Sequence, residues 1–297
     1  MALEKKWVIR QPGDPEAVRR LSAELGIDEA LASLLVQRGI KSQAEARSFL
    51  RPQLDQLHDP FLMKDMDKAV ERLSTAINRR ERILIYGDYD VDGTTAVSLV
   101  YSFLKKHSES DLDYYIPNRY DEGYGISYKS IDWASENGFT LIIALDCGIK
   151  AVEKVKYAKA KGIDFIICDH HLPGDTLPEA EAVLDPKRAD CSYPFDDLSG
   201  CGVGFKFMQA FAIKNNIPAE DVLSFLDLLV VSIASDLVSI TGENRVLAYY
   251  GLKQLNSSPR RGLLSIIKLS GLEKHSITIY DIVFKIGPRI NAAGRME

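Results

Sequence analysis

The chain has 297 residues, of which 46% are hydrophobic and 27% charged, so it can bury the core of one large domain or of two modest ones. No apolar run approaches the roughly 20 residues that span a bilayer, and the N-terminal residues lack the apolar stretch of a signal peptide, so we expect a cytoplasmic protein. The net charge of −5 argues against a broad basic surface for duplex DNA, and the four cysteines include no Cys-x-x-Cys pair, which argues against a zinc knuckle.

The first 62 residues are predicted to form a helical extension with irregular connections. One helix is predicted to open at Pro15 and another at Asp28, each followed by apolar positions at helical spacing. An Asp-Pro pair then breaks the chain at Pro60. From residue 64 to 80 apolar residues recur on one face, which predicts a long amphipathic helix.

Between residues 83 and 184 the pattern changes to short apolar strands that alternate with helices. The predicted strands are 83–86, 114–116, 141–145, 165–168 and 182–184. The predicted helices between them are 94–106, 127–137 and 151–161. Because the strands are apolar throughout, we expect an α/β fold in which a parallel β-sheet has helices on both faces. Beyond residue 202 the sequence predicts an all-helical segment, with helices at 204–214, 219–237, 244–255, 263–269 and 280–286.

Acidic and imidazole side chains follow three of the predicted strands. They are Asp88, Asp90 and Asp92 after the first strand, Asp146 after the third, and Asp169, His170 and His171 after the fourth. Asp236 comes near the end of the predicted helix 219–237. Ligands of an open parallel sheet bind at the carboxyl ends of its strands, so we expect these side chains to meet. Carboxylate and imidazole ligands together suit Mn²⁺, Zn²⁺ or Fe²⁺ better than Mg²⁺ or Ca²⁺.

Each of these residues also has a structural interpretation. An aspartate at a strand end often caps a helix, as Asp92 would before Gly93. The two adjacent histidines could be buried packing residues, and Asp236 could be the polar end of a buried helix. However, Asp88, Asp90 and Asp92 cannot all cap the same helix, and three carboxylates so close together repel each other unless a cation lies among them.

In order and spacing, these acids and histidines resemble the four motifs of DHH phosphoesterases. The first motif, at 87–96, is similar to that of the RecJ exonucleases within this superfamily, because Tyr86 stands where the small members usually carry histidine. Other similar stretches are 58–61, 116–119, 122–125, 199–204 and 287–295. The resemblance implies a helical N-terminal extension at 1–62, a DHH catalytic domain at 63–240, and a helical segment at 241–297 that includes the start of a connecting helix. A DHHA1-type domain and an oligonucleotide-binding fold follow in this family and do not fit in 297 residues, so we expect a truncated chain.

The resemblance also implies metal-dependent hydrolysis of phosphodiester bonds. The implied ligands of two Mn²⁺ ions, with Mg²⁺ as the alternative, are Asp90, Asp92, Asp146, His170 and Asp236. His171 would be a further ligand or a contact to the scissile phosphate, and Asp88 and Asp169 would orient the ligands. The implied reaction is two-metal hydrolysis of single-stranded DNA in the 5′→3′ direction, which releases 5′-mononucleotides in DNA repair and recombination.

Recognition of a 5′ end requires contacts to phosphate and to bases. Arg119, Arg289 and Arg295 are candidates for phosphate contacts because guanidinium binds phosphate in a bidentate geometry, although each could equally be a surface arginine. Tyr124 lies between two glycines and is a candidate for base stacking, with a plain loop as the alternative. Single-strand binding protein and a RecQ-type helicase are partners that the resemblance suggests.

Three other functions fit parts of the pattern. A DHH phosphodiesterase for short oligoribonucleotides, cyclic dinucleotides or pyrophosphate would share the motifs, but Tyr86 and the segment 287–295 disfavour it. A non-catalytic replication scaffold, like the eukaryotic relative Cdc45, would have lost the metal ligands, which are all present here. A nucleotide-binding dehydrogenase would need a glycine-rich phosphate loop after the first strand, where this chain has acids.

Overall fold

Two compact units, residues 1–56 and 57–297, make up this computed structural model, which describes residue 8, residues 11–273 and residues 275–294. The first unit contains α1 (Pro15–Leu25), α2 (Glu29–Val36), α3 (Gln43–Leu50) and the 3₁₀ helix η1 (Leu54–Gln56). An Asp or Ser side chain accepts a backbone N–H at the start of each α-helix. The helices predicted to open at Pro15 and Asp28 are therefore confirmed, and the domain boundaries predicted after residues 62 and 240 stay predictions.

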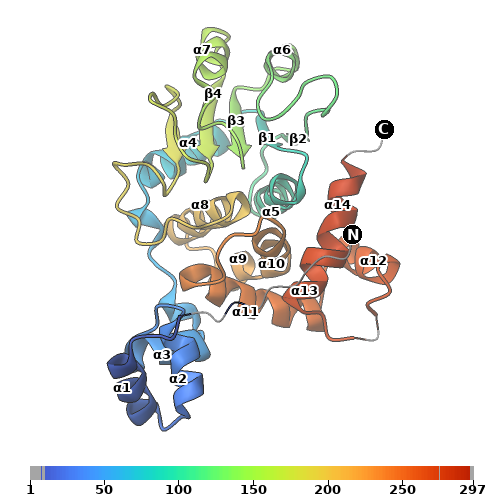
Figure 1. Cartoon of the computed structure of the whole chain (residues 1–297). Helices are drawn as coiled ribbons and strands as arrows, with labels where there is room; N and C mark the ends of the chain where they lie inside the picture. Colours follow the sequence, from blue (N-terminus) through green and yellow to red (C-terminus); the bar gives the residue numbers. More distant parts are fainter. Residues whose placement is uncertain (1–7, 9–10, 274, 295–297) are drawn as a thin grey trace, which may run out of the picture. The chain divides into compact units, whose positions relative to one another are not determined.

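The second unit is built on a five-stranded sheet (Figure 1). In spatial order its strands are β2 (Leu112–Tyr115), β1 (Ile83–Gly87), β3 (Leu141–Leu145), β4 (Asp164–Cys168) and β5 (Ala182–Leu184). All four neighbouring pairs are parallel, which confirms the predicted α/β fold. Successive strands are added on one side of β1 (β2) and then on its other side (β3, β4 and β5). The carboxyl ends of β1 and β3 therefore flank the crevice where such sheets bind ligands.

Helices cover both faces of the sheet. The covering helices are α4 (Met66–Asn78), α5 (Val91–His107) and α8 (Gly200–Lys214) on one face, and α6 (Tyr128–Glu136) and α7 (Val152–Ala160) on the other. Alternate residues of a strand point to opposite faces, so Ile83 and Ile85 pack with the first group, and Leu84 and Tyr86 pack with the second. Both sides of each central strand are therefore buried, which explains why the strands are apolar throughout.

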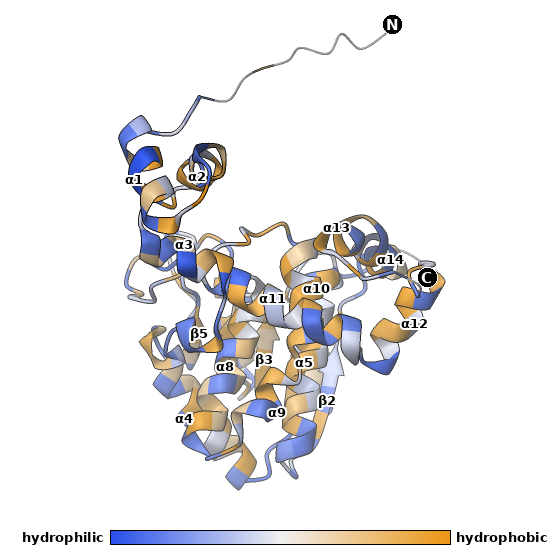
Figure 2. Ribbon diagram, turned by 90° about the horizontal axis from the view of Figure 1, so that it is seen from below, coloured by the Kyte–Doolittle hydropathy of each residue, from blue (hydrophilic) through white to orange (hydrophobic). Residues whose placement is uncertain are grey.

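The rest of the second unit is helical apart from loops. Its elements are η2 (Pro60–Leu62), α9 (Ala219–Leu223), α10 (Leu226–Ser235), α11 (Gly242–Ser257), α12 (Arg261–Leu269), α13 (Ile279–Asp281), the π-helical turn η3 (Ile282–Ile286) and α14 (Gly287–Ala293). Figure 2 shows α10 largely in the hydrophobic colours, and nine of its ten residues are buried. Within the described ranges, we find no helix whose length and apolar character would let it cross a membrane.

Two helices that border the strand ends begin earlier than the sequence predicts. α5 begins at Val91 rather than at residue 94, because the Asp90 side chain accepts the Gly93 N–H and starts the helix. α8 begins at Gly200 rather than at residue 204, because the Ser199 hydroxyl accepts a backbone N–H of the first turn. Glycines lower helix propensity, so the sequence pattern places both starts too late.

The predicted helix 219–237 is wrong, because the chain forms two helices there, α9 and α10. Asp227 lies in the first turn of α10, and its buried carboxylate accepts hydrogen bonds from the backbone N–H of Leu228 and from the Arg260 guanidinium. Apolar residues continue at helical spacing across the turn, so the pattern does not reveal the break.

A buried ion pair joins α8 to α11. Lys206 Nζ lies 2.9 Å from Glu243 Oε1 and donates to the carbonyl oxygen of His58 at 2.7 Å. Glu243 also accepts hydrogen bonds from the His58 N–H and the Tyr193 hydroxyl. Neither charged side chain is exposed. Both charges are paired and hydrogen-bonded, as buried charges must be.

Candidate metal centre

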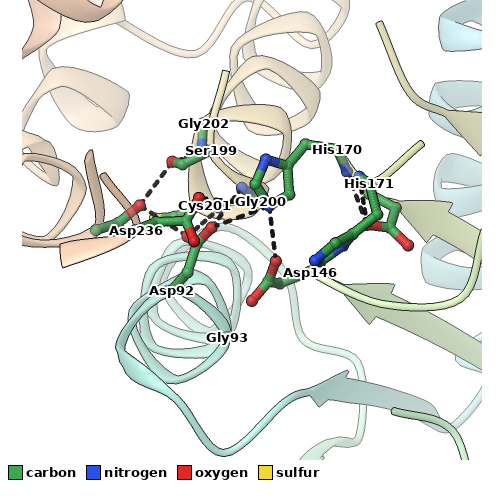
Figure 3. A network of polar contacts seen from close by, with 12 residues as sticks. Asp92, Gly93, Asp146, His170, His171, Ser199, Gly200, Cys201, Gly202 and Asp236 are labelled. Carbon is green, nitrogen blue, oxygen red and sulfur yellow. Dashed lines mark hydrogen bonds and ion pairs between the residues drawn. The ribbon is translucent and has the colours of Figure 1, made fainter. Parts of the chain in front are cut away.

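The acids and histidines that follow β1, β3 and β4 lie together at the carboxyl edge of the sheet (Figure 3). The backbone pairing continues past the strand ends, because Asp146 N donates to Cys168 O and Asp169 N donates to Leu184 O, both at 2.9 Å. Asp236, which directly follows α10, reaches the same place from the helical side. Four separate segments thus deliver ligand-type side chains to one point.

His170 lies at the centre of this cluster. Its Nε2 is 3.2 Å from Asp146 Oδ1, 3.6 Å from Asp236 Oδ2 and 3.7 Å from Asp92 Oδ2. The described part of the chain contains two groups of three residues that could hold a metal ion, and in each group the potential ligand atoms all lie within 4.8 Å of one another. One is Asp146, His170 and His171, and the other is Asp92, His170 and Asp236. Because the two groups share His170, the arrangement suits two neighbouring cations.

The buried atoms of the cluster fit a divalent cation. Asp146 Oδ1 and both ring nitrogens of His170 are buried without a hydrogen-bond partner among the described residues. Buried polar atoms are normally paired, because an unpaired one loses its hydration without compensation. Here the unpaired atoms are oxygen and nitrogen ligands close to one another, so a cation among them would satisfy them and offset the negative charge. The residues therefore form a metal-binding cluster of the acidic and imidazole type.

Burial and mutual repulsion shift the titration of these groups. Burial raises the pKa of Asp146 well above its ordinary value, and the negative charges of Asp92 and Asp90 raise it further. Burial also raises the pKa of Asp236 to about 7, again with repulsion from Asp92 and Asp90. The pKa of His170 is lowered by burial, which favours the neutral imidazole that binds metals.

Asp92 is held by the start of α8. Gly200 N donates to Asp92 Oδ2 at 2.6 Å, and Cys201 N donates to Oδ1 at 2.8 Å. The Ser232 hydroxyl also donates to Oδ1, at 2.7 Å, and is itself 2.6 Å from the Ser199 hydroxyl. Both carboxylate oxygens are therefore oriented by donors on the protein side.

Asp90, rather than Asp92, caps α5. Its Oδ1 accepts the Gly93 N–H at 2.9 Å, so the interpretation of Asp92 as that cap is wrong. Asp90 belongs to neither group of close ligand atoms. Its charge nevertheless raises the pKa of Asp146, which means that it lies within electrostatic range of the cluster. Its role as a metal ligand stays a prediction.

The backbone at Asp146 is constrained by α8. Asp146 has φ 60°, in the left-handed region that residues other than glycine rarely adopt. A Cβ on Gly200 would lie 2.5 Å from the Cβ of Asp146, so only glycine lets α8 approach this closely. Backbone strain of this kind is typical of functional sites.

Asp169 orients His171. Its Oδ1 accepts hydrogen bonds from His171 Nδ1 at 2.7 Å and from the backbone N–H groups of His170 and His171, and its Oδ2 accepts the Ile149 N–H. Burial alone would raise the pKa of Asp169, but the hydrogen bond and charge of His171 lower it. With Nδ1 bound to Asp169, His171 presents Nε2, which lies 3.2 Å from the Tyr124 hydroxyl.

Two further buried acids border the cluster. Asp88 is fully buried, and burial raises its pKa to about 6. Asp185 directly follows β5 and is also fully buried, with a pKa that burial raises to about 7. Asp185 is not among the residues predicted from the sequence, although it follows a strand just as the other acids do. Ser232 is not among them either, and no pattern could reveal its hydroxyl because Ser232 is 140 residues from Asp92.

Two predicted substrate contacts lie around Tyr89, within the first motif. The exposed Arg119 guanidinium is 5.2 Å from the centre of the Tyr89 ring. The Tyr124 ring meets Tyr89 edge to face at 6.4 Å, and 55% of Tyr124 is exposed. Tyr89 thus contacts both a cation and an exposed aromatic ring, and the Tyr124 ring also meets the His171 ring edge to face.

The predicted arginines near the C-terminus lie on or beyond α14. Arg289 is exposed and donates to the backbone carbonyl of Lys285 at 2.7 Å. α14 contacts the first motif, because Asn291 Oδ1 accepts the Val91 N–H at 3.1 Å. Arg295 lies outside the described residues, so its role is a prediction alone.

The chain is similar to proteins of one family, both in sequence and in structure. The family description "DHH family, N-terminal domain" matches residues 82–233. The single-stranded-DNA-specific exonuclease RecJ of Bacillus subtilis (strain 168) is 42% identical over 297 residues, and that of Escherichia coli (strain K12) is 33% identical over 277 residues. A solved structure of RecJ in complex with Mn²⁺ from Thermus thermophilus covers 96% of this chain with a TM-score of 0.79 and 26% identity.

These matches cover only part of the relatives. The chain spans 37% of the Bacillus protein, 47% of the Escherichia protein and 40% of the Thermus chain. The match to the first two covers 100% and 90% of this chain. The similarity thus covers 90% or more of this chain but less than half of each longer relative.

Proposed function

The chain belongs to the DHH family, and from this membership we propose that it is the catalytic portion of a single-stranded-DNA-specific exonuclease that works in the 5′→3′ direction. Metal-dependent hydrolysis is supported by the position of His170 Nε2, which lies within 3.7 Å of three carboxylates. Single-stranded DNA is supported as the substrate because the curated relatives at 42% and 33% identity are named for this activity. The proposed products are 5′-mononucleotides, formed during DNA repair and recombination.

The proposed ligands of two Mn²⁺ ions, with Mg²⁺ as the alternative, are Asp90, Asp92, Asp146, His170 and Asp236. When bound, divalent cations would supply activation of a water molecule and charge neutralisation at the attacked phosphate. The chain itself prepares the ligands. The N–H groups at the start of α8 and the Ser232 hydroxyl orient Asp92, and α8 also abuts Asp146.

The remaining residues are proposed to position the DNA. Asp169 holds Nδ1 of His171, which leaves Nε2, beside the Tyr124 hydroxyl, as the atom that would contact a metal ion or the scissile phosphate. Arg119 and Arg289 are exposed cations suited to phosphate, as Arg295 would be. Tyr124 presents a half-exposed ring on which a base can stack. We further propose a cytoplasmic location, with single-strand binding protein and a RecQ-type helicase as partners.

The test combines nuclease assays with an isosteric variant. The chain is incubated with Mn²⁺ and with end-labelled single-stranded DNA, duplex DNA or RNA, and in parallel with a cyclic dinucleotide or pyrophosphate. Asp146→Asn is the control, because asparagine tolerates the φ of 60° that alanine would strain. We expect 5′-mononucleotides from single-stranded DNA only, and none from the variant.

Mn²⁺ binding to both proteins is measured separately by titration calorimetry. If the chain binds Mn²⁺, and the variant does not, but only the cyclic dinucleotide or pyrophosphate is hydrolysed, then the metal centre stands and the proposed substrate is wrong. If neither Mn²⁺ nor Mg²⁺ binds, the metal centre itself is wrong.

A further inference from the structure

A pocket of about 220 Å³ adjoins the metal-binding cluster on the side of α7. Its walls come from the loop after β2, the loop between β3 and α7, and the end of β4. The lining residues are Tyr124, Gly125, Ile126, Cys147, Gly148, Ile149, Lys150, Ala151, Lys154, Asp169 and His171. Most of them are not assigned to metal binding, so the pocket needs its own explanation.

The pocket shares a wall with the metal-binding cluster. His171 and Asp169 line it directly, and Cys147 follows the cluster residue Asp146 in the chain. The Ile149 N–H donates to Asp169 Oδ2 at 2.9 Å, which fixes the loop between β3 and α7 against the strand ends. A phosphate bound next to His170 would therefore have its neighbouring sugar and base within reach of the pocket.

The opposite wall is held rigidly in place. The Tyr86 hydroxyl donates to the Gly125 carbonyl at 2.9 Å, and the Tyr86 ring stacks on Tyr115 at 5.6 Å. Glu122, two residues before Tyr124, accepts hydrogen bonds from the Asn118 N–H and the Tyr115 hydroxyl. The loop that carries Tyr124 is thus tied at several points, so the pocket is formed before any ligand arrives.

The pocket is lined by apolar side chains inside and by lysines at its α7 end. Ile126, Cys147 and Ile149 are at most 3% exposed and form an apolar floor, with the Tyr124 ring as an aromatic side. Lys150 is exposed and Lys154 half-buried, and neither forms an ion pair with a residue that the structure describes. Two ammonium groups beside an apolar slot with an aromatic side favour a ligand that has both an aromatic ring and negative charge.

We propose that this pocket binds the base and sugar of one nucleotide next to the scissile phosphate, with Lys150 and Lys154 contacting a phosphate of the same strand. This inference rests on the proposed nuclease function. The volume equals that of about seven liquid water molecules, which leaves room for a single aromatic ring system. A base enters such a pocket only after it leaves its stack and its pairing partner, which costs a few kcal/mol for a duplex and less for a single strand. The pocket thereby selects single strands at the metal centre.

The test measures binding of thymidine 5′-monophosphate and of inorganic phosphate to the metal-free chain by calorimetry. The first variant is Lys150→Ala with Lys154→Ala. Its matched control is Lys156→Ala with Lys159→Ala, which removes the same charge from exposed positions of α7 outside the pocket. A third protein, Ala151→Phe, adds a ring at a half-buried wall position.

We expect the first variant to bind the mononucleotide about tenfold more weakly or worse, because it loses charge-assisted contacts. Ala151→Phe should bind the mononucleotide no better than inorganic phosphate, and the control pair should match the unmodified chain. Mn²⁺ affinity should be unchanged in all of them, which separates the pocket from the metal centre. With single-stranded DNA, both pocket variants should raise KM and leave kcat within about twofold.

Two outcomes would overturn the pocket assignment. One is equal mononucleotide binding by the lysine variant and its control. The other is equal affinity of the unmodified chain for inorganic phosphate and for the mononucleotide, which would mean that no base is bound. If mononucleotide binding changes as expected but no DNA is cut, then the nucleotide pocket stands and the exonuclease proposal fails. If DNA is cut and the pocket variants bind and cut as the unmodified chain does, then the exonuclease proposal stands and the nucleotide pocket is wrong.

Discussion

Replacement of Gly200 by alanine tests whether the start of α8 shapes the metal centre. The added Cβ would lie 2.5 Å from the Cβ of Asp146, 2.6 Å from its Oδ1 and 2.8 Å from its Cα. All three separations are below normal van der Waals contact, and two involve atoms that no side-chain rotation can move. Either α8 or the strand end that carries Asp146 must therefore shift.

The size of the effect follows from the contacts that such a shift would disturb. Overpacking of this kind costs about 1–3 kcal/mol of folding stability. A shift of α8 also lengthens the 2.6 Å bond from Gly200 N and the 2.8 Å bond from Cys201 N to Asp92. Loss of the donors that orient metal ligands typically lowers metal affinity about 10–100-fold, so we expect Gly200→Ala to bind Mn²⁺ that much more weakly.

The assay is calorimetric titration with Mn²⁺, together with thermal unfolding of the metal-free protein. Gly262→Ala is the matched control, because Gly262 also lies in the first turn of a helix and its Cβ would meet no atom within 4 Å. Ser232→Ala is a second variant that removes a donor to Asp92 without adding volume. If Gly200→Ala loses stability but binds Mn²⁺ within about twofold of the control, then α8 supports the fold alone and the reasoning is refuted.

Two further predictions concern the buried charges. In the metal-free protein the pKa of Asp236 is raised to about 7, so the stability that its protonated form contributes is complete below pH ~4 and is lost as pH rises through 7. Mn²⁺ displaces this proton and binds the folded state, so we expect Mn²⁺ to raise the unfolding temperature more at pH 8 than at pH 6. Scanning fluorimetry measures this difference, and a rise in unfolding temperature that is independent of pH would contradict it. Glu243→Gln leaves the buried Lys206 without its carboxylate partner and should cost about 3–5 kcal/mol in urea unfolding, whereas the exposed Glu153→Gln should change stability by less than about 0.5 kcal/mol. A loss below about 1 kcal/mol for Glu243→Gln would show that Lys206 finds another partner or loses its charge.

The sheet and the gathering of acids were predictable because both depend on local pattern and general topology. Apolar runs such as 141–145 become strands buried on both faces, and parallel strands align their carboxyl ends. Asp146 and His170 are therefore adjacent for the same reason that β3 and β4 pair. Asp185, which follows the short strand β5, obeys the same rule and was predictable in the same way.

The groups that orient the acids were not predictable from the sequence. The N–H groups of Gly200 and Cys201 bind Asp92 across 108 and 109 residues, and a backbone donor has no side chain that a pattern could reveal. The glycines at the start of α8 lower helix propensity, so the sequence pattern predicts that this helix begins four residues later than it does. Only the packing of α8 against β3, which needs the missing Cβ of Gly200, makes this turn part of the site.

The hydrogen bonds divide the acids of the cluster according to what each can do. Asp169 accepts four hydrogen bonds from N–H groups of the protein, three of them on Oδ1, so this acid orients His171 and holds the Ile149 N–H. Asp146 Oδ1 and the ring nitrogens of His170 have no such partner among the residues that the structure describes, although they are buried. These buried ligand atoms thus lack the hydrogen bonds that Asp169 has, and a cation among them would satisfy them and offset the negative charge of the acids. That imbalance, rather than the count of acids, is the physical argument that the edge of this sheet binds metal.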